Sequence, residues 1–132
     1  MALILNIESA TTMCSVALGK DGICIDLEEL NDGYSHAEKL AVFADELLKR
    51  NSLSSSDLDA IAVSKGPGSY TGLRIGTSVA KGLCYSLEIP LIAVSSLESL
   101  AQLMIPFIES KDSLLMPCFD ARREDGFYAI YD

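Results

Sequence analysis

The sequence has little positive charge, one histidine and no tryptophan. Ten Lys and Arg residues stand against nineteen Asp and Glu residues, which gives a formal net charge of −9 at pH 7. A surface with this balance repels phosphate backbones, so the chain alone is not expected to bind nucleic acid. Because His36 is the only histidine, it has no second imidazole with which to share a metal ion. A surface or capping role is therefore expected for it rather than that of a base.

Long apolar runs and paired cysteines are also missing. Cys14, Cys24, Cys84 and Cys118 form no C-x-x-C pair, so neither a zinc knot nor a redox pair is indicated, and free, mostly buried thiols are expected. The apolar runs have the length of strands, and the start of the chain shows no basic segment followed by a cleavage site. These absences predict a cytoplasmic protein that does not contact membranes.

The pattern that is present predicts an α/β lobe with a mixed sheet. Residues 22–30 alternate apolar and polar side chains, as a strand with one buried face does, and Leu40, Phe43, Leu47 and Leu48 fall on one face of a helix. The run at 89–95 is wholly apolar, which is typical of a strand covered on both sides. We expect strands at 3–9, 14–19, 22–30, 57–65 and 89–95, and helices at 35–50, 70–86 and 96–108. Ser35 and Ser95 or Ser96 are candidate N-caps.

The last residues resemble the first ones. Laid over "LILNIESATTMCSVAL" at an offset of 112, "LMPCFDARREDGFYAI" matches apolar with apolar residues and places Asp120 on Glu8. Chance similarity between two hairpins is the alternative to an internal duplication. The duplication predicts a first lobe over residues 1–110 and, over residues 111–132, the opening hairpin of a second, truncated lobe.

A duplicated lobe with carboxylates at strand ends is the plan of the actin, sugar-kinase and Hsp70 ATPase superfamily, whose lobes are ribonuclease H-like. Within it, "GPGSYTGLRIGTSVAKGL" resembles the signature of the TsaB (YeaZ) family, and "SHAEKLAVFADELL", "IPLIAVSSLESLA" and "DARREDGFYAIYD" resemble further segments of that family. The resemblance implies an actin/Hsp70-like fold and an accessory role in forming threonylcarbamoyladenosine on tRNA. The older names glycoprotease and M22 peptidase are not taken as its chemistry.

The resemblance also implies a subunit without its own chemistry. The related catalytic subunit TsaD carries a metal-binding H-x-x-x-H, whereas Ser96 and Leu100 stand at the matching positions here. A hydroxyl is a weak metal ligand and an isobutyl group is none. No catalytic residue and no metal are therefore expected. The implied partners are a TsaD-like catalytic subunit and a TsaE-like ATPase, with a homodimer in their absence and only indirect contact with tRNA.

Two other classes of protein stay open. Glu8, Ser9, Thr11 and Asp120 are the candidate residues of a nucleotide site, which would make the chain an autonomous ATPase or kinase that uses ATP and Mg²⁺. However, "IESATT" lacks the glycines that let a phosphate approach the backbone, so no cofactor is expected. A peptidase, the third class, would need a nucleophile with a base, or a metal.

The stretch "SKGPGSYTGLRIG" is not a Walker A loop, because Gly66 and Gly72 are one residue too far apart and Leu73 and Arg74 stand where Lys and Ser or Thr belong. It is not G-x-G-x-x-G either, because Thr71 occupies the place of the last glycine. A tight turn is the safer prediction, and an anion at the start of the following helix is the alternative.

Gly72, Gly76 and Ala80 leave one side of that helix nearly bare. We expect this small-residue stripe to meet a neighbouring molecule while Leu73, Ile75, Val79 and Leu83 serve the core, so that Gly76→Leu would abolish dimerisation and leave a folded monomer. The alternative is that the stripe packs on the chain's own sheet, in which case this substitution would unfold the domain. In the family resembled, the first two helices form the contact between subunits. The expected interface residues are His36, Leu40, Phe43, Leu47, Gly72, Leu73, Gly76 and Ala80.

Overall fold

A computed structural model describes residues 1–31 and 37–132 of the chain, which fold around two β-sheets. The first part runs β1 (Leu3–Glu8), β2 (Cys14–Lys20), β3 (Ile23–Leu30), α1 (Ala37–Arg50), β4 (Ala60–Ser64), α2 (Tyr70–Leu87), β5 (Leu91–Val94) and α3 (Ser96–Met104). A hairpin of β6 (Cys118–Arg122) and β7 (Asp125–Tyr128) follows, and two 3₁₀ turns lie at Ser55–Asp57 and Ile105–Phe107. The predicted cap at Ser35 lies outside the described residues.

The main sheet has five strands in the order β3-β2-β1-β4-β5. β1 and β2 pair antiparallel, as do β2 and β3, whereas β4 runs parallel to both β1 and β5. The helices α1 and α2 serve as the crossovers that parallel pairing requires. The mixed sheet predicted from the sequence is therefore confirmed.

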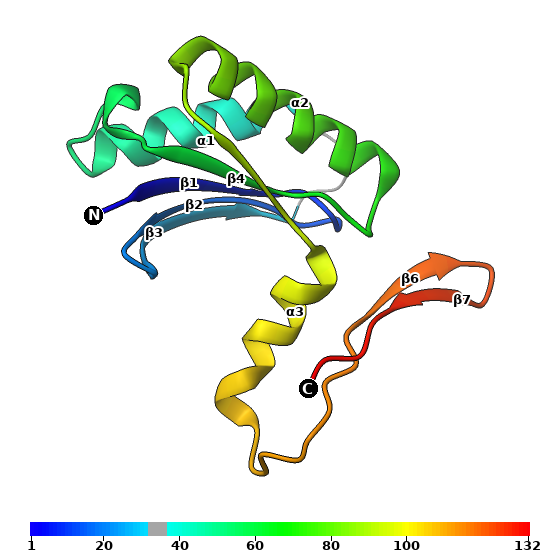
Figure 1. Cartoon of the computed structure of the whole chain (residues 1–132). Coiled ribbons are helices and arrows are strands. Elements are labelled where there is room, and N and C mark those ends of the chain that lie inside the picture. The colour runs from blue at the N-terminus through cyan, green and yellow to red at the C-terminus, as the bar shows by residue number, and fades with distance from the viewer. Residues whose placement is uncertain (32–36) are drawn as a thin grey trace.

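The core lies between the sheet and the helices α1 and α2, which cover one face of it (Figure 1). Along β1, Leu3, Leu5 and Ile7 point into this core, as the period of a strand with one buried face requires. Leu40 and Leu47 of α1 are fully buried against them. Each such side chain contributes about 1.5–3 kcal/mol through burial.

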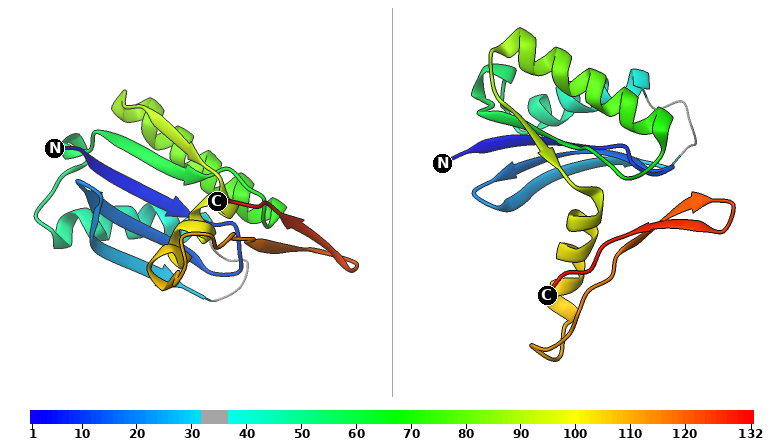
Figure 2. Two further views of the ribbon diagram at one scale, coloured as in Figure 1. Left: turned by 60° about the horizontal axis from the view of Figure 1, so that its bottom comes forward. Right: turned by 45° about the vertical axis from the view of Figure 1, so that its right-hand side comes forward.

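The opposite face of the sheet is mostly open, because α3 leaves it at one end and the β6–β7 hairpin lies beyond (Figure 2). The prediction that the strand at 89–95 is covered on both sides is wrong. β5 is the last strand in the sheet, Leu91 packs toward the core, and Ile92 stays 40% exposed on the open face.

The third helix is shorter than predicted. α3 is nine residues long, and a 3₁₀ turn with Pro106 near its start replaces the expected last turn. Proline has no N–H with which to continue the α-helical hydrogen bonds, so the helix stops. The start is as expected, because the Ser95 side chain accepts a hydrogen bond from the Glu98 N–H at 3.4 Å.

The predicted hairpin forms near the end of the chain. Cys118 pairs with Tyr128, and Arg122, Arg123 and Glu124 at the turn have φ values of 69°, 54° and 67°. Asp120 is the third residue of its strand rather than the last, unlike Glu8, which ends β1.

Two further findings concern features that the sequence lacks. Cys14 and Cys84 are buried and Cys24 and Cys118 are exposed, so the free thiols are not mostly buried. Within residues 1–31 and 37–132, none of the helices has the length and apolarity needed to cross a membrane.

Candidate functional site

The glycine-rich loop between β4 and α2 is a tight turn fixed to two other segments. Gly68 adjoins the turn after β1 so closely that an added Cβ would lie 2.5 Å from the Ala10 carbonyl oxygen. The Ser69 N–H donates to that same oxygen at 2.6 Å, and the Ser96 N–H donates to the Gly66 carbonyl at 3.0 Å. The loop thus joins the end of β1 to the starts of α2 and α3.

The small-residue stripe of α2 faces the chain's own sheet. A Cβ added at Gly72 would overlap the backbone oxygen of Ser9, and one added at Gly76 would overlap the Ser9 hydroxyl oxygen. Ala80 is fully buried. The prediction that Gly72, Gly76 and Ala80 meet another molecule is therefore wrong, because the end of β1 fills the space that their missing side chains leave.

The same correction applies to part of α1. Leu40 and Leu47 are fully buried in the core, so neither side chain is available to a partner. Phe43 and Leu73 are half-buried, and their place in an interface stays a prediction. His36 lies outside the described residues.

The four candidate nucleotide-binding residues do not all come together at one site. Both carboxylate oxygens of Glu8 already accept hydrogen bonds, one from the Ala10 N–H at 2.7 Å and one from the Ser64 hydroxyl. Ser9 is 1% exposed, and its hydroxyl donates to the Gly72 carbonyl at 2.8 Å. Glu8 and Ser9 thus hold the end of β1 in place, and their role in binding nucleotide or Mg²⁺ stays a prediction.

Thr11 does share a pocket with Asp120. This pocket of about 1040 Å³ lies between the turn after β1, the start of α2 and the β6–β7 hairpin. Hydroxyl groups line one side, and Asp120, Arg122 and two phenylalanines line the other; the residues are Ala10, Thr11, Thr12, Gly68, Ser69, Tyr70, Thr71, Cys118, Phe119, Asp120, Ala121, Arg122 and Phe127. Among the described residues, no three His, Cys, Asp or Glu side chains are placed to hold a metal ion.

The outer face of α2 presents a ridge between two shallow hollows. Arg74 and Ser78 border both hollows, which measure about 340 and 330 Å³. Ile75 and Val79 line the first hollow, and Tyr70, 75% exposed, lines the second. The Arg74 guanidinium carbon lies 5.5 Å from the centre of the Tyr70 ring. Side chains four residues apart, such as Arg74 and Ser78, form a ridge that can pack into the groove of a second helix, whose own side chains can enter the hollows beside it.

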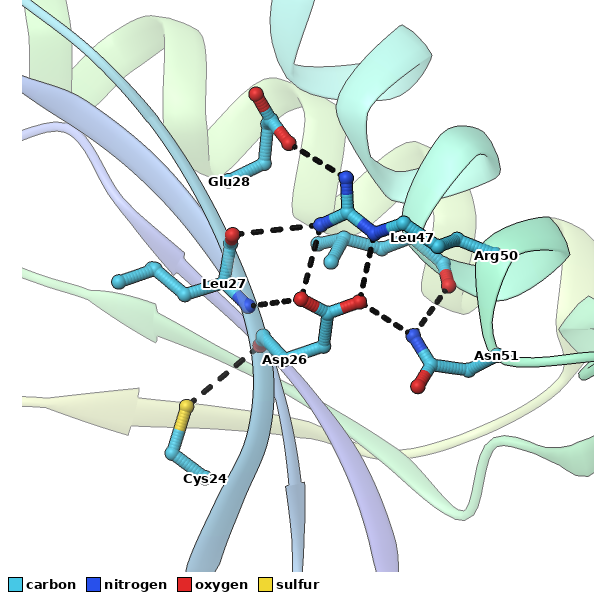
Figure 3. Close-up of polar contacts among 7 residues, drawn as sticks. All are labelled: Cys24, Asp26, Leu27, Glu28, Leu47, Arg50 and Asn51. Carbon is cyan, nitrogen blue, oxygen red and sulfur yellow. Dashed lines mark hydrogen bonds and ion pairs between the residues drawn. The ribbon is translucent and has the colours of Figure 1, made fainter.

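A cluster of polar side chains lies at the edge of the main sheet that β3 forms, where α1 ends beside β3 (Figure 3). Arg50 binds Asp26 with two nitrogens at 2.8 and 2.9 Å and Glu28 with a third at 3.0 Å. The Asn51 amide donates to Asp26 at 2.6 Å and to the Leu47 carbonyl at 2.8 Å. We call Asp26, Glu28, Arg50 and Asn51 the edge network.

The edge network sets a pH dependence. Hydrogen bonds from Arg50 and then Asn51 hold the pKa of Asp26 well below its usual range. A lowered pKa stabilises the fold above the unfolded value of about 3.9, and this contribution disappears as the pH falls through the folded value. In urea denaturation, the difference between the wild type and Asp26→Asn should stay constant from about pH 8 to pH 5 and shrink below about pH 4.

Arg50 binds Glu28 as well as Asp26, and Asp45 and Lys49 pair on the exposed side of α1. Since those groups are common to the two proteins, the comparison isolates Asp26. Parallel curves down to pH 2 would mean that Asp26 is not held by its neighbours.

Together, a five-stranded mixed sheet with this topology and a glycine loop sealed onto the end of β1 define an α/β lobe of the actin/ribonuclease H-like class. A solved structure of RuvC from Thermus thermophilus shares this fold, with a TM-score of 0.50 at 11% identity over 84% of this chain and 82% of that one. The predicted fold class is confirmed by a closer likeness to YeaZ from Pseudomonas aeruginosa, with a TM-score of 0.87 at 33% identity over 99% of this chain and 60% of that chain.

Residues 33–132 match the family model "TsaD: tRNA N6-adenosine threonylcarbamoyltransferase", and the chain belongs to this family, on the branch of the TsaB (YeaZ) proteins. The Bacillus subtilis tRNA threonylcarbamoyladenosine biosynthesis protein TsaB is 38% identical over 97% of this chain and 54% of its own length. The Escherichia coli protein of the same name is 35% identical with the same coverage. The chain thus spans about half the length of these curated relatives.

Sequence reasoning missed both polar features of the surface. The ridge of α2 had a signal, since Tyr70, Arg74 and Ser78 recur every fourth residue on the side away from the glycines. The edge network had none, because Asp26 and Arg50 are 24 residues apart and meet only after β3 and α1 have packed.

Proposed function

We propose that this chain is an accessory subunit that supports the transfer of a threonylcarbamoyl group to adenosine in tRNA, and that it does so by binding a TsaD-like catalytic subunit. The names of its relatives support the pathway, and the acidic composition supports a role in which another subunit contacts the RNA. A TsaE-like ATPase completes the proposed assembly. In the absence of the catalytic subunit, the same surface forms a homodimer.

The proposed contact surface is the outer face of α2, with the ridge of Arg74 and Ser78 and its two hollows. This surface replaces the small-residue stripe, which is buried against the sheet. The observation that carries the proposal is an exposed ridge with half-buried apolar side chains, Ile75 and Val79, on one flank. Arg74 gives it a positive charge that an acidic group of the partner complements.

The test is Arg74→Glu. Because the side chain is exposed, the fold should be retained, while charge reversal in the middle of the contact should weaken binding to the catalytic subunit about tenfold or more. Titration calorimetry with the purified TsaD protein of the same organism measures this, and formation of threonylcarbamoyladenosine in a reconstituted mixture should fall with it. Lys111→Glu makes the same charge change at an exposed site outside α2 and should bind normally. Equal affinity of both variants for the TsaD protein would contradict the proposed surface.

The pocket of about 1040 Å³ favours a second candidate function, the binding of a nucleotide. Phe119 and Phe127 offer a face for a base, and Arg122 offers a charge for a phosphate. Titration with ATP and Mg²⁺, compared between the wild type and Arg122→Ala, decides between the two functions. Heat of binding that Arg122→Ala removes would favour the nucleotide-binding protein over the accessory subunit.

The proposed division of the chain is a first lobe over residues 1–110 and the start of a second lobe over residues 111–132. The division is supported by the strands, because β1 to β5 form one sheet and β6 and β7 form a separate one.

A further inference from the structure

β3 is a long strand at the end of the main sheet, and within the described part of the chain one of its edges faces no other strand. It spans eight residues, and its open-face side chains are apolar: Ile23, Ile25 and Leu27 are 68%, 43% and 46% exposed. A free edge with such side chains is a template for pairing with a strand of another chain. Proteins block such edges with charged groups, bulges or a covering segment.

The edge network occupies two of the backbone groups that such pairing would use, both at Leu27. The Leu27 N–H donates to Asp26 Oδ1 at 2.9 Å, and the Leu27 carbonyl accepts from Arg50 Nη2 at 3.4 Å. Both groups at the middle of the strand are therefore bound by side chains instead of facing free water. Arg50 is in turn fixed by Asp26 and Glu28, so the guanidinium stays over the edge (Figure 3).

We propose that the edge network is a lock on the free edge of the sheet, which prevents β3 from pairing antiparallel with β3 of a second copy of this chain. A second copy is the partner that fits, because antiparallel pairing of two β3 strands would place their exposed apolar side chains side by side on one continuous sheet. The bulk of Arg50 and its bonds to Leu27 stand in the path of that strand.

The test removes the lock without changing the net charge. Asp26→Thr/Arg50→Met takes away one acid and one base and leaves side chains suited to their strand and helix. In sedimentation at tens of micromolar, we expect this variant to associate by one step more than the wild type, because any homodimer formed through α2 is common to both proteins. The matched control is Asp45→Thr/Lys49→Met, which removes an exposed ion pair of 2.6 Å on the same helix and should behave like the wild type.

Adding Leu27→Pro to the unlocked variant identifies the edge, because proline removes the N–H that a pairing strand would bind. The triple variant should return to the association state of the wild type. An unlocked variant that is folded by circular dichroism and no more associated than the control would overturn the proposal, as would additional association that persists in the triple variant.

A measurement on the wild type covers the case in which the unlocked variant does not fold. Hydrogen exchange of the Leu27 amide should be slower than that of an exposed peptide by tenfold or more, since Asp26 accepts its hydrogen. Exchange at the rate of a free peptide would show that the edge groups are unoccupied, and the lock would not exist.

Discussion

Gly72→Ala is expected to destabilise the chain by about 3 kcal/mol or more, a large part of the roughly 5–15 kcal/mol that holds a typical domain folded. The added Cβ would overlap the backbone oxygen of Ser9, and Ser9 is itself fixed in place. Ser9 is 1% exposed, and its hydroxyl bonds to the carbonyl of Gly72 itself. The end of β1 therefore has no room to move away. Urea denaturation followed by circular dichroism measures the loss.

Gly82→Ala is the matched control in the same helix. A Cβ there meets nothing within 4 Å among the described residues, so the substitution should stabilise the chain by about 0.5–1 kcal/mol through helix propensity alone. Opposite signs for the two variants are the expected result. Equal effects would mean that α2 does not sit as closely on β1 as described.

The same overlap changes the expected outcome of Gly76→Leu. The sequence predicted a folded monomer that no longer dimerises, whereas the structure places a Cβ at this position against the Ser9 hydroxyl. We now expect the leucine variant to lose its fold, because the space closed by the side chains of Ser9 and Ile7 does not admit four extra carbons.

Leu47→Ala is the second substitution with a large expected effect, a loss of about 2–5 kcal/mol in the free energy of unfolding. Leu47 is fully buried between α1 and the sheet, so truncation leaves a cavity in the core. The loss should be the same with and without the proposed catalytic partner, since no partner reaches this side chain. Thermal and urea unfolding of the purified variant test this.

Val42→Ala on the same helix separates a core position from a surface one. Val42 is 52% exposed, and its truncation should change the stability by less than about 0.5 kcal/mol. If Leu47→Ala left the stability intact and weakened only partner binding, the original prediction of Leu47 as an interface residue would be right after all.

The strands and helices of the main sheet could be predicted because each element carries its own period. β1 alternates buried and half-buried residues, and α2 repeats its small residues every fourth position. What a period does not tell is which neighbour a helix face meets. A stripe of glycines predicts close approach by some backbone, and the end of a strand satisfies it as well as a second helix does.

The candidate site was harder to predict because its residues belong together only in three dimensions. Glu8 and Asp120 match in the repeat, yet one turns to Ser64 inside the lobe and the other lines an open pocket. A carboxylate at a strand end has no intrinsic role, since nearby donors decide whether it binds a ligand or holds the backbone.

The hydrogen bonds around the glycine-rich loop also determine which segments move when the first turn of α2 is displaced. Ser69, at the start of α2, is tied to Ala10, and Gly66, three residues earlier, is tied to Ser96. Pulling the first turn of α2 outward would therefore strain the turn that follows β1 and the beginning of α3 at the same moment. Thr11, next in the chain to Ala10, forms part of the wall of the large pocket, so the same hydrogen bonds connect the first turn of α2 to that wall.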